Sequence, residues 1–182
     1  MNFNDVPVSN PPDSYLDVIT PLIGTARSIL EKGESLAAIT FVGNFATKDV
    51  QPVLMDSRSA QSKDTTATAI RNIAHAIKAD FVFMIVEAWS LRPDKIKNAD
   101  EILDKYGSIG ASPYAIDIVS FTLETRYGTW VAQCPIKPLG FSKKKKTIAK
   151  PEFRLFKEIQ GRFTDLLPEK EGELPGEAST LH

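Results

Sequence analysis

Apolar side chains recur at helical spacing in two segments of the first half of the chain. From Ser14 to Leu30 they return every three or four residues, which predicts a helix that ends near Gly33. Pro21 predicts either a bend in this helix or a second start with Pro21 in the first turn. A polar segment at 56–64 precedes a second helical pattern, which we expect to run to about Ala79.

Other segments have the spacing and composition of strands. Residues 36–46 and 50–55 predict an antiparallel hairpin, with Pro52 marking an edge or the beginning of a strand. Residues 81–89 are apolar on both alternating faces except at Glu87, which predicts a central strand that is covered on both sides. Two further runs, 114–125 and 129–136, flank a short turn with a glycine and predict a second hairpin.

The remaining segments divide the chain into one domain and two tails. Residues 98–106 predict a short helix, and 151–167 fits a helix with Pro151 in its first turn, although a strand fits almost as well. We choose the helix. Residues 1–13 are polar and interrupted by proline, which predicts a flexible arm, and the acidic residues 168–182 predict a disordered tail. Residues 14–167 are then a single domain.

This order of elements predicts an α+β fold. We expect about five strands in a mostly antiparallel sheet, with two or three helices packed on one face. Helices on one face leave the other side of strand 81–89 without cover. The sequence therefore predicts a homo-oligomer, most simply a dimer, or a protein partner that supplies this cover.

Composition excludes several classes of protein. The 182 residues are 42% hydrophobic and 25% charged, as in ordinary globular domains. No apolar run reaches the roughly 18 residues that a membrane-spanning helix requires, and the first residues do not resemble a secretory signal. One cysteine and two histidines exclude an intramolecular disulfide framework and a multi-cysteine zinc site. We predict a cytoplasmic protein with no membrane association, no cofactor and no metal.

Charge is distributed unevenly although the formal net charge is only −1. Residues 137–162 hold nine basic side chains against two acidic ones, and four of the nine are consecutive, at Lys143, Lys144, Lys145 and Lys146. Phe141, Phe153 and Phe156 alternate with these charges. Lysines that neutralise phosphates beside aromatic rings that stack on bases are typical of nucleic-acid binding. The alternative is a solvated basic loop at 137–150.

The polar loop from Asp56 to Asp64 precedes a predicted helix and is a candidate anion site. Free backbone N–H groups at the helix start, with Arg58, Ser62 and Lys63 beside them, favour an anion there. The alternative is that Ser62 or Asp64 only caps the helix.

Asp56 and Glu87 are the candidate catalytic residues. Each follows or ends a predicted strand, so a shared divalent cation would make a metal-dependent hydrolase or nuclease. The order of elements resembles the restriction-nuclease core at a coarse level. The motif of that family is missing, because Asp56 leads into Ser57 and Arg58 and no acid-x-lysine strand follows. The alternative for Glu87, which we prefer, is an ion pair with Arg92, Arg71 or Arg126, or exposure at the end of the strand.

The stretch Ala79-Asp80-Phe81, followed by an apolar run to Glu87-Ala88-Trp89, resembles a pattern in uncharacterised bacterial and phage open reading frames. The resemblance covers roughly residues 62–136. It implies a bacterial or phage origin and no assigned activity.

These observations order three hypotheses. The first is a non-enzymatic domain that self-associates or binds a protein partner. The second is a metal-dependent hydrolase or nuclease that uses Asp56 and Glu87. The third is nucleic-acid binding through the basic segment Lys137–Arg162.

Overall fold

The computed structural model describes residues 3–169. Within this range the chain has three α-helices and two short 3₁₀ segments. They are η1 (Phe3–Asp5), α1 (Asp13–Glu31), α2 (Ala60–Ala76), η2 (Pro93–Asn98) and α3 (Ala99–Tyr106). Helix α1 is continuous through Pro21, so the predicted second start does not occur.

Six strands form one sheet in the order β2-β1-β3-β4-β5-β8, and every neighbouring pair is antiparallel. A separate two-stranded ribbon, β6–β7, follows β5. The strands are β1 (Ile39–Asn44), β2 (Asp49–Leu54), β3 (Phe81–Leu91), β4 (Ala115–Thr125), β5 (Gly128–Pro135), β6 (Lys137–Pro138), β7 (Lys146–Thr147) and β8 (Arg154–Phe156). The predicted α+β class and both predicted hairpins are confirmed, with one more strand in the main sheet than expected.

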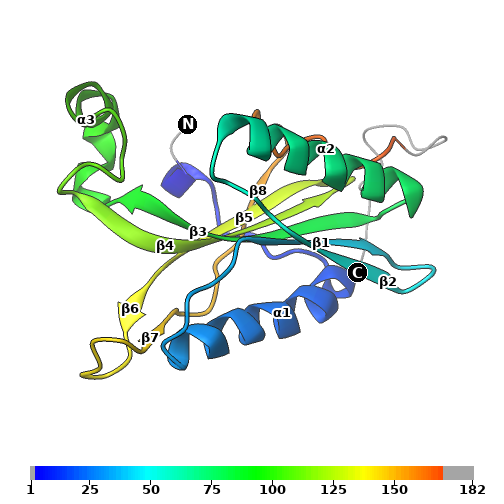
Figure 1. Cartoon of the computed structure of the whole chain (residues 1–182), viewed down its shortest axis with the longest axis horizontal. Helices are drawn as coiled ribbons and strands as arrows, with labels where there is room; N and C mark the ends of the chain where they lie inside the picture. Colours follow the sequence, from blue (N-terminus) through cyan, green and yellow to red (C-terminus); the bar gives the residue numbers. More distant parts are fainter. Residues whose placement is uncertain (1–2, 170–182) are drawn as a thin grey trace.

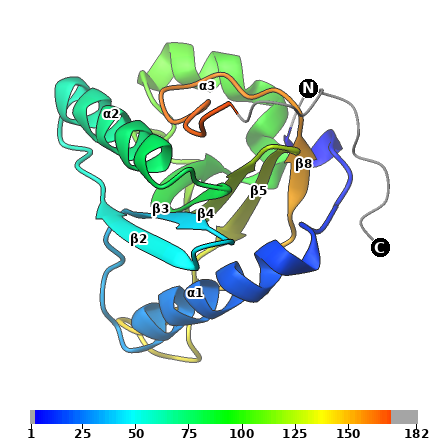
Figure 2. The ribbon, with the colours of Figure 1, turned by 90° about the vertical axis from the view of Figure 1, so that its right-hand side faces the viewer.

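The helices lie on opposite faces of the sheet (Figures 1 and 2). This corrects the expectation that they share one face. Helix α1 packs on one face through Ile19, Ile23 and Leu30, against side chains from β3, β4 and β5. Helix α2 packs on the other through Ile70 and Ala74, against β1 and β3. The sheet is therefore the middle layer of three.

Strand β3 is the centre of both hydrophobic clusters. Phe81, Phe83 and Ile85 face α1, whereas Val82 and Met84 face α2, and all five are buried. Side chains alternate in direction along a strand, so a run that is apolar on both faces requires two covers. Here the chain itself provides both, and the cover expected from a second subunit is not needed at this place.

The segment 151–167 is not a helix, which corrects our choice. Its only regular element is the short strand β8, paired with β5. The reason is that its apolar side chains pack on different faces of the sheet. Phe153 is buried in the cluster under α1, and Leu166 is fully buried in the cluster under α2. A single helix packed on one face of the sheet cannot bury Phe153 on one side and Leu166 on the other.

Residues 3–9, part of the predicted flexible arm, lie beside β8 (Figure 2). Val8 forms a β-bridge with Arg154, Ser9 N–H donates to the Phe153 carbonyl at 2.7 Å, and the ring of Phe3 stacks on Phe156. The predicted acidic tail lies outside the described residues from position 170 onward.

Pro52 leaves a gap at the open edge of the sheet. Met55 N–H donates to the Ala38 carbonyl of the chain leading into β1, at 2.9 Å. Backbone N–H groups alternate in direction along a strand, so those of Val53 and Gln51 also face β1, while position 52 faces outward. Proline has no N–H to present there. This edge therefore lacks a donor that a second strand would need.

We expect Pro52→Thr to promote association through β2, because threonine restores the outward N–H and favours strands. Sedimentation velocity over a concentration series measures this, with larger species appearing at lower concentration than for the wild type. The control is Gln51→Thr, at a position whose N–H already faces β1. Identical distributions for all three proteins would show that Pro52 does not protect the edge.

Candidate functional site

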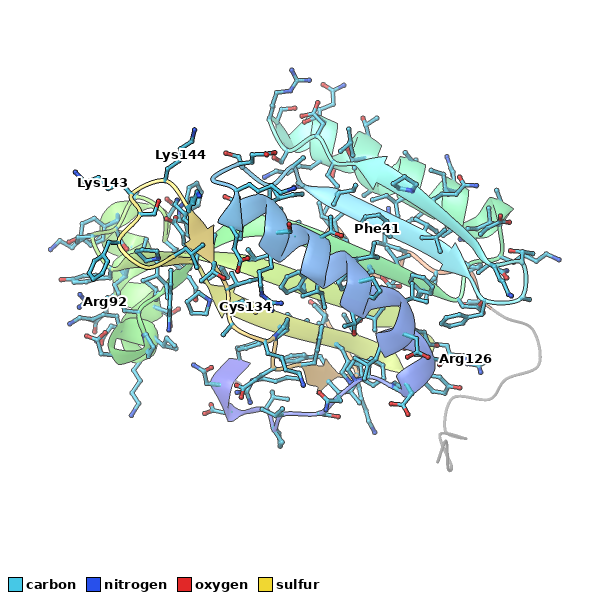
Figure 3. The ribbon with its side chains drawn as sticks, turned by 90° about the horizontal axis from the view of Figure 1, so that it is seen from below. Phe41, Arg92, Arg126, Cys134, Lys143 and Lys144 are labelled. Carbon is cyan, nitrogen blue, oxygen red and sulfur yellow. The ribbon has the colours of Figure 1, made fainter. Side chains whose placement is uncertain are left out.

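Several exposed basic residues gather at the end of the molecule where β3 and β5 finish. Segment η2 and helix α3 follow β3 there, and the β6–β7 ribbon follows β5. Figure 3 shows Arg92, Lys143 and Lys144 at this same end. We call this surface the basic end and define it by Trp89, Arg92, Lys95, Tyr114, Lys137 and Lys143–Lys146.

Cations and aromatic rings are interleaved on the η2–α3 side. The ring of Tyr114 lies 5.5 Å from the Arg92 guanidinium carbon and 5.0 Å from the Lys95 ammonium nitrogen. Tyr106 contacts Tyr114 edge to face, with 6.4 Å between ring centroids, and Lys105 lies over Tyr106. Cation–π contacts hold these charged groups on the surface. Arg92 Nη2 also forms an exposed ion pair with Asp94 Oδ2, at 3.2 Å. Lys95, Lys105, Tyr106 and Tyr114, together with Glu101, line a shallow depression of about 220 Å³.

The β6–β7 ribbon projects a structured turn. Leu139 N–H donates to the Lys145 carbonyl at 2.9 Å, and the Ser142 hydroxyl accepts the N–H groups of Lys144 and Lys145 at 3.3 and 2.9 Å. All four lysines at 143–146 are exposed, and Phe141 beside them is fully exposed. The predicted basic loop is thus an ordered ribbon with its charges in solvent.

Two contacts fix the ribbon to helix α1. The Thr147 hydroxyl donates to Glu31 Oε1 at 2.7 Å, and Arg27 Nε donates to the Ile148 carbonyl at 3.0 Å. The aliphatic part of Lys144 packs on Gly33, where an added Cβ would lie 3.0 Å from Lys144 Cγ. The lysines therefore have a defined position relative to the sheet.

Trp89 lies near the end of β3, three residues before Arg92 and two strands from the start of the β6–β7 ribbon. On β3 it is opposite Asp117 of β4, and the Asp117 carbonyl accepts the N–H of Ile136, the residue before β6. Trp89 is 62% exposed although it shares the face of Phe81, Phe83 and Ile85. One side of its indole packs on Gly110, where a Cβ would lie only 2.7 Å from Trp89 Cε3. The ring is thus held flat on the loop with most of its surface in solvent.

The basic residues at 154 and 162 are used elsewhere in the fold. Arg154 donates to the Val6 carbonyl, and Arg162 forms an ion pair with Asp64. The predicted basic segment Lys137–Arg162 is therefore divided, and only its ribbon keeps an exposed cluster of positive charge.

Asp56 and Glu87 are engaged in separate interactions. Both carboxylate oxygens of Asp56 accept hydrogen bonds from Arg58, at 2.7 and 3.0 Å, and these bonds hold the pKa of Asp56 well below its usual range. Glu87 is exposed, and its Oε1 accepts the Leu36 N–H at 3.0 Å. Within residues 3–169 no three His, Cys, Asp or Glu side chains are placed to hold a metal ion. The geometry gives no support to a shared cation.

The candidate anion site at 56–64 is a helix start. Ser59 is the N-cap of α2 and forms a capping box with Ser62, whose N–H donates to Ser59 Oγ at 3.0 Å. The sequence suggested Ser62 or Asp64 as the N-cap, and this is wrong, because the N-cap is Ser59. Arg58 is paired with Asp56, Ser62 is bonded within the box, and Lys63 is half-buried. These groups are not directed together at a common point for an anion.

The buried carboxylate of this fold is Glu124, which sequence reasoning did not single out. It lies on β4 between Val82 of β3 and Thr129 of β5, on the face of α2. Its Oε1 accepts the N–H groups of Leu166 and Leu167, at 2.8 and 3.2 Å. Burial raises its pKa above the ordinary value, in spite of these two bonds. The sequence pattern could have identified it. Glu124 is an acidic residue within a largely apolar strand, as Glu87 is.

Glu124 holds the C-terminal segment against the sheet. Leu166 is fully buried among α2 and β3 side chains. Beside this contact, the β4–β5 turn and residues 157–165 enclose a depression of about 340 Å³. Because Glu124 Oε1 already accepts two backbone N–H groups, we assign Glu124 the role of a structural clip.

We expect Glu124→Ala to lower the free energy of unfolding by about 1–3 kcal/mol, because two buried N–H groups lose their acceptor. Glu124→Gln keeps an acceptor oxygen but removes the titration. The folded-state pKa is raised, so the wild type gains stability relative to Glu124→Gln as pH falls through that pKa. The gain is complete below the unfolded pKa of about 4.3.

Urea unfolding over a pH series measures this difference. Glu158→Gln, an exposed carboxylate on the rim of the same depression, is the matched control and should leave the pH dependence unchanged. A Glu124→Gln curve parallel to the wild-type curve would contradict the buried-acid assignment.

Comparison of the chain with protein-family models, with curated proteins and with solved structures finds no match in any of the three. None of the helices within residues 3–169 combines the length and the apolar character that crossing a bilayer requires.

Proposed function

We propose that this protein is a non-enzymatic domain that binds nucleic acid through its basic end. The observation that carries the proposal is the exposed Trp89 at the same end of the molecule as exposed cations from two elements, Arg92 after β3 and Lys143–Lys146 on the ribbon. Arg92 pairs with Asp94 at 3.2 Å, and an exposed pair of this kind is weak enough for a phosphate to compete with it. Phosphates are neutralised by exposed lysine and arginine, and bases stack on exposed aromatic rings. The basic end combines both on one rigid surface.

The other two hypotheses have less support. The self-association hypothesis was motivated by an expected uncovered face of β3. In the structure α1 and α2 cover the two faces of β3 over Phe81–Ile85, so this motivation is removed. The open edge of the sheet has Pro52 at an outward position, which disfavours strand pairing between copies. The hydrolase hypothesis required Asp56 and Glu87 to act together, and each has its own partner.

Electrostatic binding predicts a steep dependence on salt. Log affinity should fall linearly with log salt, with a slope of about 0.7–0.9 for each phosphate that is neutralised. We expect replacement of Lys143, Lys144, Lys145 and Lys146 by glutamine to weaken binding to an oligonucleotide and to flatten this slope. Fluorescence anisotropy with a labelled oligonucleotide, titrated at several salt concentrations, measures both quantities.

The matched control neutralises lysines at the opposite end of the molecule. Lys48, in the β1–β2 turn, and Lys78, before β3, are both exposed there. The double variant Lys48→Gln/Lys78→Gln should leave the salt slope unchanged. The double variant Lys143→Gln/Lys144→Gln, which removes the same number of charges, should flatten it. An equal loss from both pairs would indicate non-specific charge attraction and would count against a site at the basic end.

A further inference from the structure

The exposed indole at the basic end distinguishes between forms of nucleic acid. Trp89 is 62% exposed, and its ring lies flat on Gly110 with the indole presented as a platform. In a duplex the base faces are already stacked on one another, so an indole gains nothing from them unless the duplex opens. In a single strand the base faces are free to stack on an aromatic side chain.

The charges around Trp89 direct phosphates away from the ring itself. Asp117 is directly opposite Trp89 on β4 and is exposed, so a phosphate placed over the indole would meet a carboxylate. The positive groups lie to either side instead. Arg92 follows Trp89 by three residues, and its exposed ion pair with Asp94 is one that a phosphate can displace. On the other side Ile136 lies two strand spacings, about 10 Å, from Trp89, and Lys137 follows it. This pattern fits a base over the ring and a phosphate on each side.

We propose that the basic end binds single-stranded nucleic acid, with one base stacked on Trp89 and the flanking phosphates contacted by Arg92 and by Lys137 with the ribbon lysines. This inference rests on the proposed function and makes it specific. Phe141, fully exposed at the tip of the ribbon beside Lys143, is a second ring available for stacking.

The two tryptophans of the chain allow a direct test. Trp130 is only 4% exposed, and its indole N–H makes no hydrogen bond within the described part of the chain, so Trp130→Phe removes no polar contact. The Trp130→Phe protein then reports on Trp89 alone. We expect an oligothymidylate to quench its fluorescence, and a duplex of the same length to quench it much less.

Affinity measurements on the otherwise wild-type chain give a second readout that does not depend on Trp130→Phe. We expect Trp89→Ala to weaken oligothymidylate binding about tenfold or more while leaving the salt slope unchanged, because stacking involves no counterions. Gly110→Ala should weaken it in the same way by displacing the ring. Val50→Ala, at an exposed apolar residue level with the start of β3 and so away from the basic end, should have no effect.

The outcomes separate this inference from the proposed function. Equal affinity for duplex and single strand, or unchanged affinity in Trp89→Ala, would overturn the stacking inference and leave nucleic-acid binding in place. No salt-dependent binding to either form would overturn both. Anionic vesicles of phosphatidylcholine and phosphatidylserine serve as a further probe. A blue shift of Trp89 with vesicles, without a response to oligothymidylate, would assign the surface to a membrane and would also overturn both.

Discussion

The structure depends on the apolar character of both faces of β3. Phe83 and Val82 are adjacent in the chain and point to opposite sides of the sheet, and both are fully buried. Burial of large apolar side chains is the dominant stabilising contribution in a domain of this size. The chain must therefore provide a layer on each side. Helix α1 precedes the sheet and forms one layer, and α2, inserted between β2 and β3, forms most of the other.

The same constraint explains the irregular C-terminal half. After β5 the chain returns to add β8 at the edge, buries Phe153 on the side of α1, and then places Leu166 on the side of α2. Glu124 makes this last step possible, because it accepts the backbone N–H groups that a strand or helix would otherwise satisfy. The buried Glu124 therefore stabilises the irregular C-terminal segment by satisfying its backbone N–H groups.

Much of the fold follows from local sequence patterns, whereas the site depends on tertiary placement. The strands at 81–91 and 115–125, and the helix beginning at Asp13, were readable because their spacing matches their burial. The segment 151–167 was misread because its apolar residues are divided between two faces, which periodicity alone does not reveal. Asp56, Arg58 and Ser62 were plausible candidates until the geometry showed them bonded to near neighbours. Lys143–Lys146 were readable as a charge cluster, but their position near Trp89 required the sheet register.

Cys134 is the only cysteine in the chain and lies on β5 beneath α1, where burial raises the pKa of its thiol to about 11. At neutral pH this thiol is almost entirely protonated and shielded from solvent, so it reacts slowly with electrophiles. We therefore expect the native chain to react little with maleimide reagents. A single cysteine introduced on the ribbon would therefore carry a spectroscopic label at one chosen place, without any prior removal of native sulfur.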